Sequence, residues 1–392
     1  FVLVEGVGIG LAGAIRCTIL QARGEEQTPR TCFSGTVLLL LATSAAFAAV
    51  LLGLLGPVLT VLGAQDEARP LAAEYIRVIA YGTAFQILAT GLVPFIRNLG
   101  GSAFAMVAMG TGFVTNIALD YLFIGGFGMG PEGAALATTL SQAASVALAL
   151  FVITRRESGI SVSRGDLRPK RAVMGQILKI GVPITLQDGF IQISFIIITI
   201  IVNMRGLADA AAVGIVEKMM SFLFLVPSSM LSAVSALGAQ NLGAGKPERA
   251  RLTLRYAAMI AVAFGAVVSV LMQFAAEPAV ALFTDPASPG GAEVVRLGGQ
   301  YMRGYVWDCI FAGVHFCFSG YFCACGRSGI SFMHNVASII LVRVPGVYLT
   351  SKYFAATLFP MGLAATAGSL LSVAICAAAY AVITKKERVA RA

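Results

Sequence analysis

The stretch NIALDYLFIGGFGMGPEGAALATTLSQ, Asn116 to Gln142, contains the end of one apolar segment, a turn rich in glycine and the start of a second apolar segment. Long apolar segments without period-two alternation are typical of membrane-spanning helices. On such a helix, Asn116 and Asp120 share one face and lie about one turn apart. A carboxylate in an apolar segment is costly unless something compensates it, so this pair requires a structural or a functional explanation.

The composition of the whole chain indicates the same class of protein. The 392 residues are 58% hydrophobic and only 12% charged, with a mean hydropathy of +0.85. This composition excludes a soluble globular protein and a disordered one, and it predicts an all-α polytopic membrane protein. The long, unbroken apolar runs favour helices over a β-barrel. They predict about eleven spans, at 1–20, 33–55, 73–96, 105–124, 133–154, 177–203, 211–237, 256–276, 300–322, 331–352 and 362–383.

Positive charge is distributed unevenly between the two ends of these spans. When alternate loops are assigned to opposite sides, 20 of the 28 Lys and Arg residues fall on one side, including seven between Arg155 and Lys179. The positive-inside rule makes this the cytoplasmic side and places the C-terminus there. We therefore expect a multi-pass protein of the plasma (inner) membrane. The net charge of +9 is interpreted as a surface for lipid headgroups, and nucleic-acid binding is not expected.

The chain contains an internal repeat. Five residue pairs share a sequence offset of 226: Tyr75 and Tyr301, Arg77 and Arg303, Phe85 and Phe311, Gly100 and Gly326, and Ser102 and Ser328. Further on, GAALATTLS from Gly133 matches GLAATAGSLLS from Gly362 at an offset of 229. An offset that drifts only through loops indicates two parallel repeats, related by an axis along the membrane normal.

The repeat predicts two pseudo-symmetric helical bundles. We expect an N-terminal lobe at 1–154, a cytoplasmic basic linker at 155–176 and a C-terminal lobe at 177–392. The first half then contains five helices and the second half six. By the offset, one amino-terminal helix is missing from the first half, so six plus six is the expected complete design.

Two stretches resemble signature sequences of the multidrug and toxic compound extrusion (MATE) family, which belongs to the multidrug/oligosaccharidyl-lipid/polysaccharide superfamily. They are the opening stretch and ALGAQNLGAGKPERA, Ala236 to Ala250. The resemblance covers the chain except for the family's first helix. It implies a secondary antiporter that exports amphipathic or cationic organic compounds in exchange for Na⁺ or H⁺, by alternating access of two lobes. We expect a monomer in the lipid bilayer.

The resemblance also implies a cation-binding site. The family's site in the N-terminal lobe uses an Asn and an Asp on one helix, and a backbone carbonyl and a Thr on the next. These correspond here to Asn116, Asp120, Ala134 and Thr138. The family's remaining acidic ligand lies on the first helix, so the site is incomplete in this chain. The alternative is that Asp120 only cross-links helices through hydrogen bonds. Either Na⁺ or H⁺ suits a carboxylate in an apolar pocket.

The second half offers weaker candidates. We expect an ion or substrate site among Asp188, Gln192, Asp308 and His315. The first two lie at i, i+4 on one predicted helix, and the last two lie two turns apart on another. Asp308 could instead form a salt bridge with Arg303, and His315 could be a packing histidine.

Two further residues are assigned to a substrate cavity. The ring of Trp307 suits a flat cation. Arg343 lies within the apolar stretch IILVRVPGVYL and needs a partner or a wet cavity.

Other classes of function are less favoured. GAQNLGAGKPERA lacks the features of a nucleotide-binding loop, so energy is expected from an ion gradient. The seven cysteines are scattered and no His/Cys set has metal-ligand spacing, so no metal and no cofactor beyond Na⁺ or H⁺ is expected. With two histidines and no catalytic constellation, the chain is not expected to be an enzyme. The remaining alternative is a lipid-linked saccharide flippase of the same superfamily, which needs a strongly cationic cavity.

Overall fold

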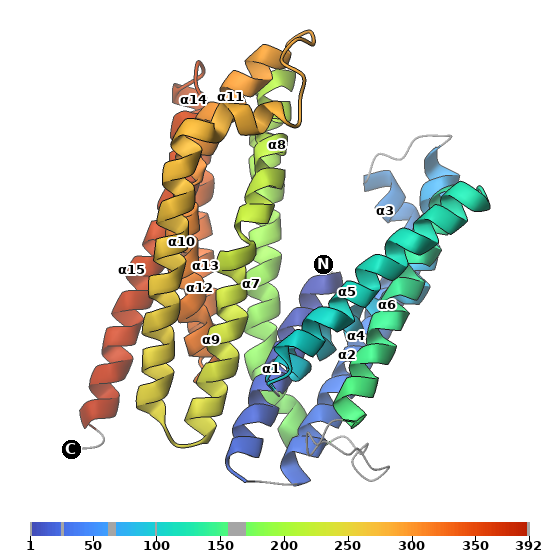
Figure 1. Cartoon of the computed structure of the whole chain (residues 1–392), viewed down its shortest axis with the longest axis vertical. Helices are drawn as coiled ribbons and strands as arrows, with labels where there is room; N and C mark the ends of the chain where they lie inside the picture. The colour runs from blue at the N-terminus through green and yellow to red at the C-terminus, as the bar shows by residue number, and fades with distance from the viewer. Residues whose placement is uncertain (1, 25–26, 62–67, 99, 156–169, 390–392) are drawn as a thin grey trace. The chain divides into compact units, whose positions relative to one another are not determined.

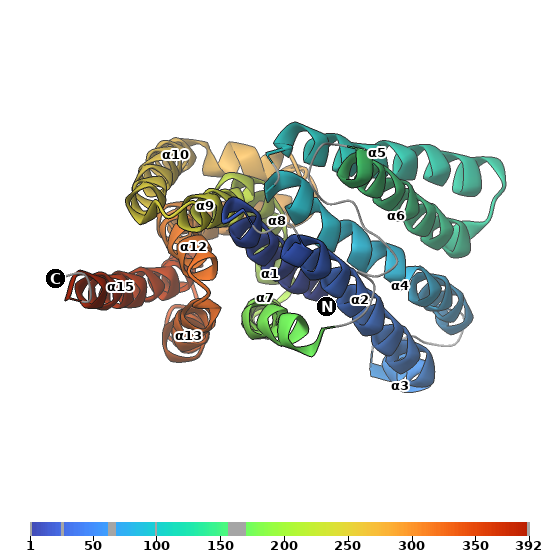
Figure 2. The same cartoon turned by 90° about the horizontal axis from the view of Figure 1, so that it is seen from below.

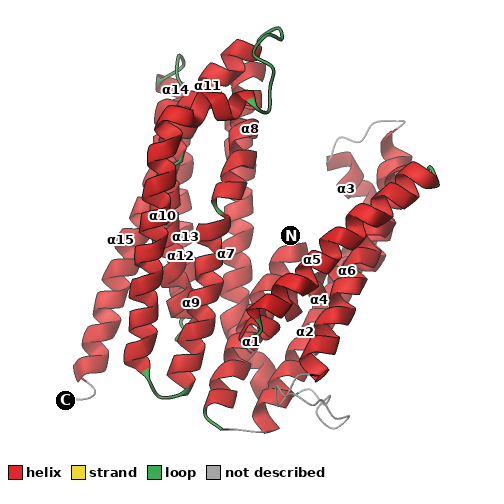
Figure 3. Ribbon diagram, viewed as in Figure 1, coloured by secondary structure: helices red, strands yellow, loops and turns green. Residues whose placement is uncertain are grey.

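The described part of the protein is built from helices. A computed structural model describes residues 2–24, 27–61, 68–98, 100–155 and 170–389, and the regular elements in these ranges are all helical (Figure 1) (Figure 3). The predicted all-α fold is confirmed. The chain divides into two compact units, Phe1–Thr185 with Gly243–Gly245, and Leu186–Leu242 with Lys246–Ala392. They are called the first and the second unit below.

The first unit is organised around one helix, α4. Its helices are α1 Val2–Ala22, α2 Gln27–Gly53, α3 Leu55–Val61, α4 Ala68–Asn98, α5 Ser102–Asp120, the π-helix η1 Tyr121–Gly126 and α6 Gly130–Arg155. α4 packs against α1, α2, α5 and α6, and Figure 2 shows it running between α2 and α6. In the most apolar 18-residue stretch of α4, 67% of the residues are buried, compared with 17% for the span formed by α5 and η1. α4 is therefore the core helix of this unit.

α1 and α4 cross at two glycines. A Cβ atom on Gly10 would lie 2.3 Å from the Cα of Gly91, so no side chain fits between the two backbones at this point. In lipid, helix association depends on close packing of small residues, since burying an apolar side chain gains little over leaving it in the hydrocarbon. Gly10 and Gly91 therefore set how closely α1 approaches the core helix.

The second unit is organised around α15. Its helices are α8 Leu207–Leu223, α9 Leu225–Gly243, α10 Pro247–Ala281, α11 Gly291–Tyr305, α12 Asp308–Ala324, α13 Ser328–Ser338, the π-helix η3 Ile339–Arg343, α14 Val344–Tyr353 and α15 Phe359–Val389. α7, Arg171–Asn203, crosses the boundary between the units. α15 packs against α11, α12, α13, η3 and α14. It meets α11 at a glycine, because a Cβ atom on Gly362 would lie 2.5 Å from the carbonyl oxygen of Tyr301.

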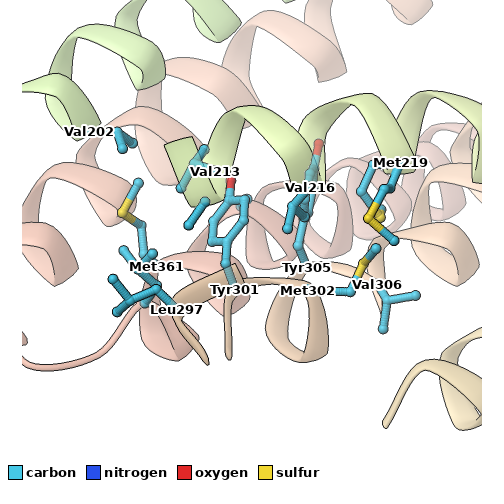
Figure 4. Packing of buried hydrophobic residues seen from close by; sticks show 14 of the residues in the cluster. Val202, Val213, Val216, Met219, Leu297, Tyr301, Met302, Tyr305, Val306 and Met361 are labelled. Atoms are coloured by element: carbon cyan, nitrogen blue, oxygen red, sulfur yellow. The ribbon is translucent and has the colours of Figure 1, made fainter. Parts of the chain in front are cut away.

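The apolar core of the second unit contains two tyrosines. Tyr301 and Tyr305 are each 1% exposed, and they lie in a buried cluster with residues of α7, α8 and α15. In Figure 4 their rings extend from α11 toward Val213 and Val216 of α8. The core of this unit therefore contains phenolic hydroxyls among its apolar side chains.

Each of the eleven predicted spans coincides with a helix or with a run of consecutive helices. Among the described residues, nine helices are long and apolar enough to cross a membrane, and the number is ten if α11 and α12, bent by 41°, count as one span. The shorter apolar helix Val7–Ala22 accounts for the first predicted span. α10 begins at Pro247, well before the predicted start at 256, because its first turns are polar and contain the ion pair Glu248–Arg251. Hydropathy does not detect such turns.

The predicted linker at 155–176 is only partly described. Residues 156–169 lie outside the described residues, and α7 begins at Arg171, before the predicted end of the linker. The predicted lobe boundaries at 154 and 177 stay a prediction.

We expect Gly10→Ala to destabilise the protein, because the new methyl group would overlap the backbone of Gly91. Overpacking of this kind costs about 1–3 kcal/mol. The apparent Tm of detergent-solubilised protein should fall by several degrees. Gly110→Ala is the matched control, since a Cβ atom there meets nothing within 4 Å, and its Tm should not fall. An equal loss of stability in both variants would contradict the close crossing of α1 and α4.

Candidate functional site

Asp120 lies at the junction between an α-helix and a π-helix. α5 ends at Asp120, and the chain continues without a break as η1. π-Helical turns are rare and frequently lie at functional sites. Asn116 is one turn before Asp120 on the same face, and both residues are partly exposed.

Contacts between α5 and α6 fix the register of this helix pair. The hydroxyl of Ser145 donates a hydrogen bond to the carbonyl of Ala108, at 2.9 Å. One turn further along α5, a Cβ atom on Gly112 would lie 2.4 Å from Oγ of Ser145. At the other end of the pair, a Cβ atom on Gly133 would lie 3.1 Å from Cβ of Phe123. The helices are therefore in contact on both sides of the predicted cation site.

From this antiparallel register we expect the four predicted cation ligands of the first unit to lie close together. Counting helical turns between the contacts places Asn116 level with Thr138, and Asp120 level with Ala134. The Thr138 hydroxyl donates to the Ala134 carbonyl at 3.0 Å, so two of the four are already hydrogen-bonded. In the described structure, Nδ2 of Asn116 and Oδ1 of Asp120 are buried and have no hydrogen-bond partner. Buried polar atoms without a partner are rare and costly, so each needs an explanation.

The α7 candidates of the second unit differ in exposure. Asp188 is half-buried. Gln192 is exposed. The neighbouring Gln187 is only 1% exposed, and its Oε1 has no partner among the described residues. A joint site of Asp188 and Gln192 with the α12 candidates stays a prediction.

Asp308 is buried at the start of α12. It is 1% exposed and hydrogen-bonds the side chain of Ser369 on α15, while its Oδ1 has no partner among the described residues. The alternative of a salt bridge between Asp308 and Arg303 is wrong. Arg303 pairs with Glu277 of α10 at 3.0 Å. The two residues are five positions apart, a spacing that places side chains on different faces of a helix even though they are close in sequence.

Arg343, the last residue of η3, is held by aromatic side chains. Its Nη2 donates to the hydroxyl of Tyr305 at 3.0 Å, and its guanidinium carbon lies 4.9 Å from the ring centroid of Phe195. It interacts electrostatically with Asp308 and with Glu217 of α8. The predicted need of Arg343 for partners is therefore met within the second unit.

The remaining candidates are Trp307 and His315. Trp307 is half-buried and packs against the apolar core of the second unit. His315 and His334, the only two histidines of the chain, lie with their ring centroids 5.5 Å apart. Nε2 of His334 lies 3.0 Å from the Ser319 hydroxyl, and Nδ1 of each histidine is buried without a partner in the described structure. Close packing of the His315 ring on Phe316 agrees with a packing role.

Sequence reasoning did not identify two residues near Arg343. Glu217 lies in the apolar run AAAVGIVEKMMSFLFLV, and its Oε1 is buried without a partner in the described structure. An acidic residue within an apolar run indicates a functional or paired site, so Glu217 could have been identified from the sequence. Ser369 gave no signal, because a serine is common in membrane helices.

The comparison with known families agrees with this architecture. The sequence model of the MatE family matches residues 1–122 and 183–349. The chain belongs to the MATE family. A probable multidrug resistance protein of Bacillus subtilis, YoeA, is 23% identical over 100% of this chain and 85% of its own length. A multidrug export protein of Staphylococcus saprophyticus, MepA, is 24% identical over 72% of this chain, which spans 62% of that protein.

Solved structures of MATE proteins have the same fold. A crystal structure described as MATE in complex with MaL6 superposes with a TM-score of 0.91 at 20% identity, covering 99% of this chain and 86% of the other. An outward-facing multidrug resistance MATE family transporter gives a TM-score of 0.83 at 22% identity, covering 95% and 82%. At these identities the likeness concerns the fold, and this MATE chain is a multi-pass membrane protein.

We expect a disulfide to form between Asn116→Cys and Thr138→Cys in a background without the seven native cysteines, because the register places the two residues level. Oxidation followed by mass spectrometry of proteolytic fragments detects the cross-link. Ile117→Cys with Thr138→Cys is the matched control, since Ile117 is 70% exposed one position further along α5. Equal cross-linking of both pairs would contradict the register.

Proposed function

We propose that the protein is an ion-coupled exporter of small amphipathic or cationic organic compounds. In this proposal Asp120, Asn116, Thr138 and the carbonyl of Ala134 bind the coupling cation. The observation that carries the proposal is Oδ1 of Asp120 at the junction of α5 and η1, which is buried and has no partner among the described residues. The names of the relatives, multidrug resistance and multidrug export protein, support organic substrates.

The chemistry of the four groups suits a hard monovalent cation. A carboxylate, an amide, a hydroxyl and a backbone carbonyl offer only oxygen ligands, which alkali cations prefer over sulfur or imidazole. A proton would serve equally, because a protonated carboxyl becomes a hydrogen-bond donor. In either case the bound ion supplies the partner that Asp120 lacks. Na⁺ and H⁺ therefore both remain candidates.

Coupling follows from linkage. An ion bound between α5 and α6 stabilises one packing of this helix pair, and a substrate that prefers another packing competes with it. η1 offers a hinge at this level, since a π-helical turn can shift by one residue without unfolding the helix. We propose that this two-state behaviour underlies alternating access in the plasma membrane, by a monomer with a cytoplasmic C-terminus and no cofactor beyond the ion.

The flippase alternative finds less support. A pyrophosphate group needs a concentration of positive charge. Arg343 is a partly buried cation of the second unit, and it interacts electrostatically with the carboxylates of Glu217 and Asp308. Two carboxylates around one guanidinium make an unfavourable environment for an anion.

We expect Asp120→Asn to abolish gradient-driven efflux of a fluorescent cationic dye from pump-deficient bacteria, because the amide keeps the shape but has neither the charge nor the exchangeable proton. Efflux is measured under separately imposed Na⁺ and H⁺ gradients, and the gradient that drives the parent identifies the ion. Asp285→Asn is the control. Asp285 lies in an exposed turn, where its carboxylate accepts a hydrogen bond from the backbone of Ala287.

Protein abundance in the membrane must be equal in the three strains. Under that condition, efflux by Asp120→Asn at the parent rate would show that Asp120 is a structural residue and would reject the proposed site.

A further inference from the structure

Arg343 takes the place in the second unit that Asn116 has in the first. The dipeptide Tyr-Leu at 121–122 recurs at 348–349, an offset of 227. The offset is 226 between Ser102 and Ser328, so the second half has gained one residue within this span. η3 lies in this interval, and a π-helix is the usual way in which a helix accommodates a single inserted residue.

The alignment changes the charge at both equivalent positions, since a neutral amide becomes a cation and a carboxylate becomes an apolar side chain. At an offset of 227, Asn116 corresponds to Arg343 and Asp120 corresponds to Val347. Val347 is fully buried in the apolar core. Where the first unit presents a carboxylate and an amide, the second presents an aliphatic side chain and a covalently attached cation.

The structure holds Arg343 closely in this position. A Cβ atom on Gly368 of α15 would lie 2.9 Å from Cβ of Arg343, so only a glycine allows η3 to approach α15 here. The hydroxyl of Ser338, one turn earlier, donates to the Gly368 carbonyl. The guanidinium then reaches the hydroxyl of Tyr305 and the ring of Phe195.

The ionisable groups around Arg343 come from separate helices. Glu217 is on α8, Asp308 is on α12, and Tyr301 and Tyr305 are on α11. The only other cation that interacts with these acids in the described structure is Lys218, whose side chain is exposed. Two carboxylates from separate helices thus interact electrostatically with one guanidinium.

These charges are not locked together in a fully bonded salt bridge. In the part of the chain that the structure describes, no ion pair within 4.0 Å joins Arg343 to Glu217 or Asp308. Nε of Arg343, Oε1 of Glu217 and Oδ1 of Asp308 are each buried without a partner. Asp308 is 1% exposed, so water does not compensate it from outside. In the described structure, each carboxylate that interacts electrostatically with Arg343 therefore keeps one acceptor oxygen without a hydrogen-bond partner.

We propose that Arg343 is a tethered counter-ion that does in the second unit what the exchangeable cation does in the first. Its guanidinium compensates Asp308 and Glu217 permanently, and so confines cation exchange to the site of Asp120. This inference rests on the proposed function of Asp120. It follows that a neutral residue at 343 opens a site for a monovalent cation such as Na⁺ among these carboxylates.

The test measures gain of Na⁺ binding in an Asp120→Asn background. Purified protein is titrated with Na⁺ against choline at constant ionic strength, with two readouts: equilibrium binding of radioactive Na⁺ and the emission of Trp307. Trp307 is the only tryptophan of the chain and directly precedes Asp308. We expect Asp120→Asn/Arg343→Gln to gain about one Na⁺ per protein relative to Asp120→Asn, with a Na⁺-dependent change in emission.

Three comparisons make the result specific. Arg343→Lys keeps the charge and should gain no Na⁺, and adding Asp308→Asn to Arg343→Gln should remove the gain. Arg343→Met, also neutral and unbranched, replaces Arg343→Gln if that variant does not fold. No gain in a folded neutral variant, or the same gain in Arg343→Lys, would overturn the proposal.

One further measurement does not depend on the folding of an Arg343 variant. With Arg343 intact, the number of bound Na⁺ should not depend on Asp308, so a loss of Na⁺ binding in Asp308→Asn alone would also overturn the proposal. The effect of Asp120→Asn on the parent tests the proposed function separately. The Na⁺ bound by the Arg343 variants is compared with the Na⁺ bound by Asp120→Asn alone. One proposal can therefore fail without the other.

Discussion

Compensation of carboxylates inside an apolar helix bundle is the constraint on which both units of this MATE chain depend. The bilayer core supplies no water to stabilise a charge, so the partner must come from the chain, from a proton or from a bound ion. In the first unit, Asp120 keeps one buried oxygen without a partner in the described structure. In the second, Asp308 and Glu217 interact electrostatically with the guanidinium of Arg343. Both units therefore contain carboxylates that need compensation, and among the described residues only the second unit has a partly buried arginine that interacts with them.

Close backbone packing determines where these charges can lie. Gly112 lets α5 approach Ser145 of α6, and Gly368 lets η3 approach α15 at Arg343. A helix pair joined at a glycine has few alternative registers, because any side chain at the contact would push the backbones apart. Both close contacts lie near a π-helix. Gly112 is on α5, which continues as η1, and Gly368 is on α15, which packs against η3. The same small residues therefore determine both how these helices pack and where the charged side chains lie.

The fold was largely predictable from the sequence, because membrane helices are signalled by composition along the chain alone. Asn116 and Asp120 could be paired for a similar reason, since their spacing on one helix is local. The partners of Arg343 could not, because Tyr305, Asp308 and Glu217 come from three helices whose crossing depends on tertiary packing. Sequence proximity misled in one case. Arg303 is near Asp308 along the chain, but it forms its ion pair with Glu277 of α10.

A duplicated bundle raises the question of why its two halves should differ at an equivalent position. If both halves exchanged a cation, occupancy of each would have to be coordinated for one substrate to be moved in each cycle, since ligands couple only through states that they bind differently. A tethered guanidinium cannot dissociate from the protein, and so it adds no second exchange step. The π-helical insertion that ends at Arg343 gives the second half such a fixed charge, while the first half keeps Asn116 and Asp120 available. On this argument, asymmetry between the repeats is what allows a single ion site to control transport.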